Sequence, residues 1–566
     1  MSTHPHSTDP ASKNSTDPNA AGLNAAGLNS AMSNPADLNP ATPNPAEKIG
    51  EAASELIAHF AAVGFDSAGL SAHLGPEYLS ALHRGDPGAL RFRTQHGKEL
   101  DQLIQAFILR DPVEKNEFFQ LLGDELAAKV IDANIAVHHG PAIVRVVIDV
   151  RPHIINGKSR WVFSDPDAAM VRQDAAEDHV PGVGAASLSL LQFCPTTPVD
   201  SVLDLGTGSG VQILGQAGSA QKITGTDVST RALALADATV RGANIADDVT
   251  LLAGSWFSPV AGQRFDRIVA NPPFVVGSQE IAHTYRDSGL DLDGASELVI
   301  SEAPSYLAPG GAAYLLASWV HVDGQPWQHR VASWLPSRGV AAWVLQRDFA
   351  DPAHYVSTWL RDEAIDPRSH EASERFAQWL QHFSTHDVTA IGFGYVAIQD
   401  IGDQPSEIIA EEIPQAFDDR LADEVEEYFQ RAAWLREQSK SDIASSRFQL
   451  RPQLAREIVE VPDAAAGMGF SPRVYRLTRM DGPRWSHEVD EHVAAIVAGL
   501  HPDGLPLEEV VAMYALGHGL SDDELLDEAI GVIVDLVRHG MVLPAELVDA
   551  EALGDADAGA DADNES

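Results

Sequence analysis

Residues 203–210 read Leu-Asp-Leu-Gly-Thr-Gly-Ser-Gly, an apolar run that changes into three alternating glycines. The apolar run predicts a buried strand, and residues 211–214, Val-Gln-Ile-Leu, predict the start of a helix. The three glycines, Gly206, Gly208 and Gly210, let the backbone approach a ligand closely, which a Cβ atom would obstruct. A strand, a glycine turn and a helix N-terminus form the phosphate- or nucleoside-binding corner of a doubly wound sheet. The sequence therefore predicts an α/β fold with a ligand at this turn.

The residue that ends the next predicted strand narrows the choice of ligand. Residues 222–226 predict that strand, and Asp227 ends it. A carboxylate at this strand end can accept hydrogen bonds from both ribose hydroxyls of an adenosine. A dinucleotide fingerprint has a G-x-G-x-x-G pattern, whereas here the third glycine comes one residue early and Val211 stands where that pattern has Gly or Ala. This spacing disfavours the alternative of a nicotinamide-dependent dehydrogenase.

A second motif lies at the end of a later strand. Residues 264–270 predict this strand, and residues 271–274 read Asn-Pro-Pro-Phe. The glycine pattern, the acidic strand end and Asn-Pro-Pro-Phe together resemble the class I S-adenosylmethionine-dependent methyltransferases. They are similar to the small-domain methyltransferases, including ribosomal RNA base and release-factor glutamine N-methyltransferases. The resemblance covers roughly residues 178–400 and implies S-adenosyl-L-methionine as the cofactor.

The Asn-Pro-Pro-Phe motif suits the methylation of a planar, conjugated amine. The lone pair of such an amine is delocalised, so a site must turn the NH2 group until this lone pair faces the methyl donor. The side-chain oxygen of Asn271 and the backbone carbonyl of Pro272 can accept the two amine hydrogens, and two successive prolines form a rigid turn without N–H donors. The ring of Phe274 offers a face on which a flat base or amide can stack. The alternative is an ordinary turn, which proline pairs often mark.

Other residues of this segment are candidates through their place in the resemblance. Many family members have an Asp where Ser255 stands, to accept the adenine amino group, and Trp256 can flank the adenine ring. Residues 285–294 are polar and contain glycines, which is typical of a substrate loop, and residues 179–187 correspond to the segment that closes over the cofactor in related methyltransferases. The predicted cofactor-binding residues are Asp204, Gly206, Gly208, Gly210, Asp227, Ser255, Trp256 and Asn271; the predicted catalytic residues are Asn271, Pro272 and Phe274; and the predicted substrate-binding residues are Phe274, Tyr285 and Arg286, with no metal.

Composition divides the chain into five predicted parts. Residues 1–46 predict a disordered tail rich in Asn, Pro, Ala, Ser and Thr. Residues 47–177 predict a mainly helical, winged-helix-like domain, which could bind nucleic acid or serve as an interface. Residues 178–400 predict the methyltransferase domain, with a mostly parallel sheet of seven strands. Residues 401–548 predict a second helical, winged-helix-like domain, and residues 549–566 an acidic disordered tail.

Charge and cysteine content exclude several classes of protein. The chain of 566 residues has 82 acidic and 38 basic residues, a formal charge of −44, which argues against a broad duplex-binding face. The acidic run at 401–430 predicts solvated surface. Cys194 is the only cysteine, so disulfides within the chain and cysteine-clustered zinc are excluded. No apolar run approaches the roughly 20 residues of a membrane span, and no signal peptide is recognisable, so a cytoplasmic location is expected.

These observations predict an S-adenosylmethionine-dependent N-methyltransferase that acts on a planar amine. The expected substrate is an exocyclic base amine of RNA, ribosomal RNA above all, or of another nucleic acid, so that RNA or a ribosomal particle is the expected partner. The alternative is the side-chain amide of a glutamine in a protein. A non-catalytic cofactor-binding or assembly protein is a third possibility, which the intact Asp227 and Asn271 disfavour.

Overall fold

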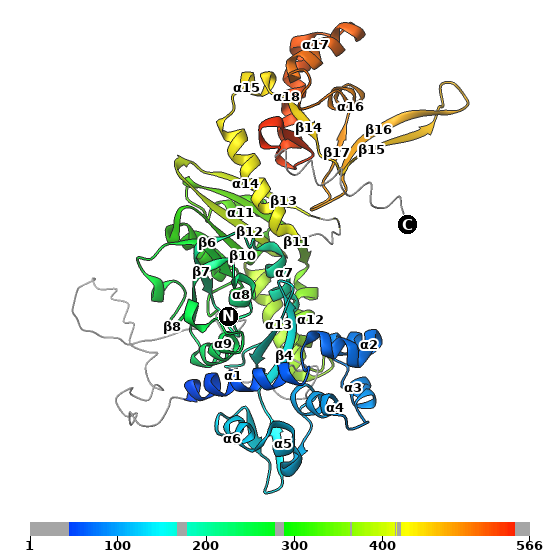
Figure 1. The fold of residues 1–566 in the computed structure, drawn as a ribbon. Helices are drawn as coiled ribbons and strands as arrows, with labels where there is room; N and C mark the ends of the chain where they lie inside the picture. Colours follow the sequence, from blue (N-terminus) through cyan, green and yellow to red (C-terminus); the bar gives the residue numbers. More distant parts are fainter. Residues whose placement is uncertain are drawn as a thin grey trace, which may run out of the picture. The chain divides into compact units, whose positions relative to one another are not determined.

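The computed structural model describes residues 45–166, 178–277, 288–362, 365–413, 415 and 420–548 (Figure 1). These residues belong to one compact unit that begins at Pro45. The two predicted tails lie outside the described residues, apart from the last two residues of the N-terminal one, with which the first helix begins.

An eight-stranded sheet forms the centre of the fold. Its strands are β6 (Val199–Leu205), β7 (Ala220–Asp227), β8 (Val249–Ala253), β9 (Phe265–Ala270), β10 (Leu307–Val322), β11 (Arg338–Ala350), β12 (Val388–Pro405) and β13 (Glu407–Glu412). The strand order is β13-β11-β12-β10-β9-β6-β7-β8. Strands β6 to β10 run parallel, and β12 runs antiparallel to both β10 and β11. The predicted mostly parallel, doubly wound sheet is confirmed, and β13 adds an eighth strand to the seven expected.

The order of the strands reverses at β6. From β6 the chain passes to β7 and β8 on one side, and β9 and β10 continue the sheet on the other. In a doubly wound sheet such a reversal leaves a crevice at the carboxyl ends of the strands, where ligands bind. The helices of this part are α7 (Ala185–Phe193), α8 (Val211–Gln216), α9 (Thr230–Gly242), α10 (Gly294–Glu302), α11 (Trp327–Ala332), α12 (Pro352–Asp362) and α13 (His370–Thr385), with short 3-10 turns η3 (Ala246–Asp248), η4 (Ser258–Val260) and η5 (Ala303–Tyr306).

The single cysteine lies in the apolar core that packs against this sheet. Cys194 directly follows α7 and is fully buried. The side-chain amide of Gln216 donates a hydrogen bond to its sulfur at 3.2 Å. Burial raises the pKa of the Cys194 thiol to about 12. The side chain therefore behaves as a small apolar core residue.

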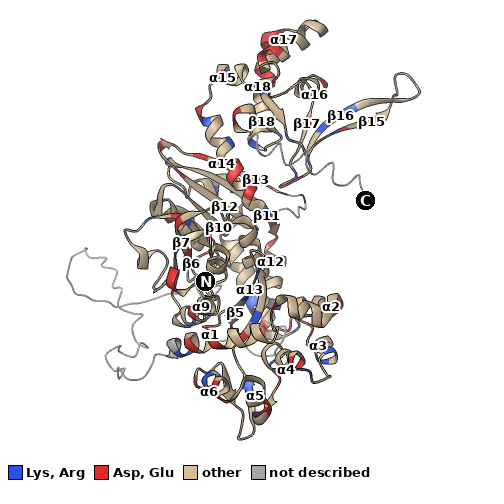
Figure 2. Cartoon of the chain, viewed as in Figure 1, with Lys and Arg blue, Asp and Glu red and all other residues tan. Residues whose placement is uncertain are grey.

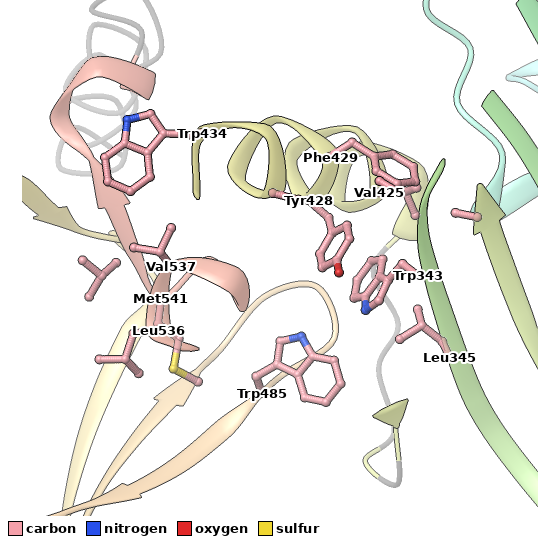
Figure 3. Close-up of a cluster of buried hydrophobic side chains, with 14 of the residues drawn as sticks. Trp343, Leu345, Val425, Tyr428, Phe429, Trp434, Trp485, Leu536, Val537 and Met541 are labelled. Carbon is pink, nitrogen blue, oxygen red and sulfur yellow. The ribbon is translucent and has the colours of Figure 1, made fainter. Parts of the chain in front are cut away.

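The acidic segment after residue 400 is part of the sheet and of its helical cover. β12 continues to Pro405, β13 pairs with β11, and α14 (Leu421–Glu437) packs on the sheet. Figure 3 shows the contact, in which the rings of Trp343 from β11 and Tyr428 from α14 stack with centroids 4.1 Å apart and planes 3° apart. The expectation of solvated surface was wrong here, because the acidic groups have partners from distant segments. Trp343 Nε1 donates to Glu411 at 2.9 Å, and the buried Glu424 pairs with Arg479 of a later strand at 2.5 Å.

The residues before the sheet form helices and two small sheets. Their elements are α1 (Pro45–Ala62), α2 (Ser67–His83), α3 (Pro87–Arg93), α4 (Glu99–Leu103), the π-helix η2 (Ile104–Ile108), β1 (Val113–Glu114), α5 (Lys115–Leu122), α6 (Asp124–Asp132), β2 (Ala136–His138), β3 (Ile143–Val146), β4 (Asp149–Ile155) and β5 (Lys158–Ser164). Strand order is β1-β3-β2 in one sheet, and β4 and β5 form a hairpin. Their apolar core includes Leu56 and Phe60 of α1 together with Leu235 of α9, so α1 packs against the central fold. The winged-helix character of this part stays a prediction.

The residues after α14 contain both helices and strands. Their elements are α15 (Lys440–Ser445), β14 (Phe448–Leu450), β15 (Leu454–Pro462), β16 (Phe470–Arg479), β17 (Ser486–Val489), α16 (Glu491–Ala498), α17 (Leu507–His518), α18 (Asp522–Arg538), β18 (Val542–Pro544) and η6 (Ala545–Leu547). The predicted helical content includes α16, α17 and α18, whereas the antiparallel sheet β15-β16-β17 was not predicted. Figure 1 shows β15 and β16 as a long hairpin. No helix in the described part of the chain is long and apolar enough to cross a membrane.

Candidate active site

Three of the predicted site positions meet at the carboxyl edge of the sheet. Leu205, the last residue of β6, pairs in register with Thr226 of β7 and with Ala270 of β9. The residues that follow these three are the glycine turn, Asp227 and Asn271. Since β6 is the strand at which the sheet order reverses, the turn lies between the carboxylate and the amide at the mouth of the crevice.

The glycine turn has the backbone that only glycine adopts easily. Gly206, Gly208 and Gly210 have φ angles of +73°, +53° and +81°. No atom lies within 4 Å of the place that a Cβ would take at Gly206 or Gly208, whereas at Gly210 it would lie 3.5 Å from Ala236 of α9. The first two glycines therefore border open space, as a close ligand requires, and the third lets the turn pack against the next helix.

Asp227 connects the second strand to this turn. Its Oδ2 accepts the backbone N–H of Gly208 at 2.9 Å, and its Oδ1 accepts the N–H of Ser229 at 2.8 Å. Burial raises the pKa of this carboxyl group above its ordinary value. Each carboxylate oxygen can accept more than one hydrogen bond, so the half-buried side chain can still bind a hydroxyl pair.

Asp204 lies deeper, under the turn. The residue is 1% exposed, and its Oδ2 accepts the hydroxyl hydrogen of Thr207 at 2.6 Å. Burial raises its pKa to about 7, more than the hydrogen bond from Thr207 lowers it. In this arrangement Asp204 supports the turn from below, and direct contact with a ligand would require the side chain to move.

The segment before the first sheet strand lies against the glycine turn. Ser209 Oγ donates to the carbonyl of Pro181 at 2.9 Å, and the amide of Gln212 donates to the carbonyl of Ser187 at 2.9 Å. These bonds hold residues 181–187 beside the turn, which is the placement expected of the segment that closes over a cofactor.

The third parallel strand contributes Ser255 and Trp256. The N–H of Gly254 donates to the backbone carbonyl of Asp227 at 3.0 Å, which brings the end of β8 to the same edge. Ser255 is exposed, whereas Trp256 is half-buried against the apolar core around Phe257. Trp256 also has a φ of +50°, a conformation that is uncommon for a bulky residue and concentrates at functional sites.

The Asn-Pro-Pro-Phe turn presents polar groups that form no hydrogen bond within the described part of the chain. Asn271 is half-exposed, and neither its side chain nor the carbonyl of Pro272 hydrogen-bonds to any residue that the structure describes. The carbonyl of Phe274, in contrast, accepts the hydroxyl hydrogen of Ser318 at 2.5 Å. The turn therefore has one end fixed by Ser318 and two acceptors, the Asn271 side chain and the Pro272 carbonyl, without a hydrogen-bond partner among the described residues.

Two residues near this turn were not predicted. Ser318 lies in β10, and Tyr355 in α12 accepts the backbone N–H of Val276 at 2.7 Å. Tyr355 is 2% exposed. The apolar residues at 355, 356, 359 and 360 follow a helical period and could have indicated a buried face. His354 on the same helix is exposed.

The predicted substrate residues Tyr285 and Arg286 lie outside the described residues. The chain on either side of them is held together, because the N–H of Leu292 donates to the carbonyl of Gly277 at 2.8 Å. Among the residues with described positions, no three His, Cys, Asp or Glu side chains are grouped as a metal site would require.

Comparison with known families agrees with this geometry. Residues 181–321 match the family model described as methyltransferase small domain. This segment of the chain is therefore a methyltransferase small domain with the fold of the class I S-adenosylmethionine-dependent methyltransferases. Two flanking segments, 62–147 and 426–544, match models described as domains of unknown function, DUF7059 and DUF7782.

Individual proteins are similar to the central segment. A release factor glutamine methyltransferase of Gloeobacter violaceus is 34% identical over 134 residues, which are 21% of this chain and 46% of the relative. A ribosomal RNA small subunit methyltransferase C of Alcanivorax borkumensis is 32% identical over 117 residues, 21% of this chain and 32% of the relative. Among solved structures, a T. thermophilus 16S rRNA N2 methyltransferase in complex with AdoMet and guanosine has 19% identity and a TM-score of 0.25, covering 42% of this chain and 65% of that one. The chain spans less than half the length of these two curated relatives.

Proposed function

We propose that the protein is an S-adenosylmethionine-dependent N-methyltransferase that acts on a planar amine. The observation that carries the proposal is the position of Asn271 at the end of β9, next to the strand β6 that leads into the glycine turn and at which the sheet order reverses. The Asn271 side chain has no hydrogen-bond partner among the described residues. A cofactor corner and an acceptor for an amine then share one crevice. The match of residues 181–321 to the methyltransferase small domain supports the same assignment.

The residues of the crevice fit S-adenosylmethionine. The open space beside Gly206 and Gly208 suits the close approach of the amino-acid part of the cofactor, and Asp227 suits its ribose hydroxyls. Ser255 and Trp256 would lie at the adenine, with the tryptophan ring as a stacking surface. When bound, the cofactor supplies a methyl group on a positively charged sulfur. Asp204 would hold the turn in place through Thr207 without touching the cofactor.

The Asn-Pro-Pro-Phe turn would orient the acceptor. The side-chain oxygen of Asn271 and the carbonyl of Pro272 accept the two hydrogens of a planar NH2, which turns its lone pair toward the methyl group. Phe274 would stack on the flat group that carries the amine. Orientation of this kind reduces the entropy cost of reaction, and no strong general base is required because the proton leaves after the methyl group has bonded.

Two substrate classes follow from this chemistry. The first is an exocyclic base amine of RNA, in a ribosomal particle above all, or of another nucleic acid; one similar protein is a ribosomal RNA small subunit methyltransferase. Figure 2 shows the Lys and Arg residues dispersed over many elements, so binding would rely on a local contact or on RNA held by another protein. The second is a protein glutamine, which the release factor glutamine methyltransferases among its relatives and the acidic composition favour.

One experiment tests both the activity and the substrate class. The protein is incubated with methyl-labelled S-adenosylmethionine and cell extract, and the labelled material is treated with nuclease or with protease. Release by nuclease supports the RNA substrate, and release by protease supports the glutamine. The Asn271→Ala variant should transfer no label while its affinity for S-adenosylhomocysteine, measured by calorimetry, changes by less than about threefold. Absence of cofactor binding by the wild-type protein would refute the proposal.

A further inference from the structure

Two hydroxyl groups from distant parts of the chain fix the backbone after Asn271. Ser318 of β10 donates to the carbonyl of Phe274 at 2.5 Å, and the hydroxyl oxygen of Tyr355 accepts the N–H of Val276 at 2.7 Å. Ser318 and Val276 are 0% exposed and Tyr355 is 2% exposed. Because water does not reach these groups, loss of either hydroxyl would leave a buried backbone group without a partner.

The ring of Tyr355 is itself held by aromatic neighbours. Its centroid lies 5.7 Å from that of Phe393, 6.0 Å from that of Phe383 and 6.1 Å from that of Trp379. These rings come from β12 and α13, so packing from two elements fixes the direction of the hydroxyl. The indole of Trp379 also lies 3.6 Å from the place that a Cβ would take on Gly277. The same cluster therefore contacts the backbone segment at two successive residues.

The direction of β11, which α12 follows, explains why α12 lies near the turn. β11 and β10 both run antiparallel to β12, so they point in the same direction. The carboxyl end of β11 then lies at the edge where β9 ends, and α12 begins directly after β11. The insertion of α12 and α13 between the last two long strands thus lies next to the Asn-Pro-Pro-Phe turn.

We propose that Tyr355, together with Ser318, is a positioning residue for the methyl acceptor. Its hydroxyl fixes the chain that leaves the turn, and this fixes the Asn271 amide and the Pro272 carbonyl relative to the glycine turn. Neither hydroxyl touches the substrate; both act through the backbone of Phe274 and Val276. The inference rests on the proposed function and adds to it the residues that hold the acceptor geometry.

The test separates positioning from stability. Tyr355→Phe keeps the ring and removes only the hydroxyl, and Ser318→Ala removes the second one. With methyl-labelled S-adenosylmethionine and the RNA or protein fraction that the wild-type protein labels, each variant should lose about ten- to a hundredfold in kcat, because small misplacements are costly. The Kd for S-adenosylhomocysteine should stay within about twofold. Hydrogen exchange at the Val276 amide should become faster in Tyr355→Phe.

A matched control is Tyr395→Phe. Tyr395 is a buried tyrosine of β12 whose hydroxyl accepts a hydrogen bond from Arg347 at 3.4 Å and makes no hydrogen bond to the described residues of the turn. The kcat of the Tyr395→Phe variant, normalised to the fraction of protein that binds the cofactor, should equal that of the wild type. An unchanged kcat in Tyr355→Phe and Ser318→Ala, with the wild type active, would overturn the inference alone and reduce the hydroxyls to a structural role. A wild type that binds the cofactor and labels nothing would overturn the proposed function, and this inference with it.

Discussion

At the scale of the residue, Asp227 combines a hydrogen bond to the glycine turn with a carboxylate that is half-exposed. It ties the end of β7 to the glycine turn through Gly208, and its carboxylate remains half-exposed at the crevice. The carboxylate of Asp204 is buried, and it accepts the hydroxyl hydrogen of Thr207 in the same turn. The two acids lie at the ends of neighbouring strands, yet their burial gives them different chemistry.

Substitution of Asp227 should weaken cofactor binding strongly. Asp227→Ala removes the carboxyl acceptor for the two ribose hydroxyls, and each lost hydrogen bond typically costs about 0.5–1.5 kcal/mol. The affinity for S-adenosylmethionine measured by calorimetry should fall at least about tenfold. Asp248→Ala is the control, since Asp248 is exposed at the opposite end of β8 and pairs with Lys222 at 3.0 Å. Equal affinity in Asp227→Ala and the control would contradict the ribose assignment.

Substitution of Asp204 should change the pH dependence of stability. Its pKa is about 7 in the folded protein, against an ordinary value near 3.9 in the unfolded chain. At pH values between these two pKa values, the unfolded state binds fewer protons than the folded state. The contribution of Asp204 to the free energy of unfolding therefore decreases as the pH rises and levels off above about pH 7. The Asp204→Asn variant lacks this contribution, because an amide does not titrate in this range. From about pH 5 to about pH 8 the variant should therefore gain about 3 kcal/mol relative to the wild type.

Urea unfolding of both proteins at a series of pH values measures this difference. The comparison with the variant cancels the other titrating groups, because they are common to both chains. A difference in unfolding free energy that does not change with pH would mean that the carboxyl group ionises normally in the folded state.

At the scale of the element, the sequence predicted what local patterns encode. The strand after which the glycines follow, the strand that ends in Asp227 and the strand before Asn271 all lie where apolar runs placed them. The edge strand β13 and helix α14 were missed, because their acidic residues Glu411 and Glu424 have partners in other elements, Trp343 of β11 and Arg479 of β16. Tyr355 was missed for a similar reason, since only the fold brings its hydroxyl to Val276. Long-range partners of this kind leave no local pattern.

The stack between β11 and α14 should be a major source of stability. Trp343 is fully buried and lies against Tyr428. Trp343→Ala would leave a large cavity and should lower the free energy of unfolding by about 3–5 kcal/mol. Phe349→Ala on the same strand is the control, because Phe349 is 58% exposed; its effect should stay below about 1 kcal/mol. Urea unfolding measures the loss of free energy of unfolding in both variants. Similar losses would show that the stacked Trp343 stabilises the fold no more than the exposed Phe349 does.

At the scale of the whole molecule, one apolar core includes residues of the sheet and of the elements that follow it. The apolar core that contains Val202 and Trp343 continues through α14 to Ile533 of α18. The predicted boundary at residue 400 falls inside β12, and β13 and α14 follow it. The division into separate domains thus stays a prediction that a shortened chain can test.

A chain that ends at residue 400 should not fold. It would lose the end of β12, all of β13 and the helix that covers Trp343, and would expose a large apolar surface to water. Gel filtration and calorimetry should show aggregation and no binding of S-adenosylhomocysteine. A chain that ends at residue 548 keeps every described element and should behave as the full chain. A soluble, cofactor-binding chain of residues 1–400 would show that the methyltransferase part is independent.

Cys194 has a practical consequence for the study of this protein. Its thiol lies in the core and is protonated at every physiological pH, so reagents such as maleimides, which require a thiolate, should leave the native chain unmodified. A cysteine introduced at any exposed position would then be the single reactive site. Spectroscopic probes for distance measurements could be attached there without first removing the natural residue.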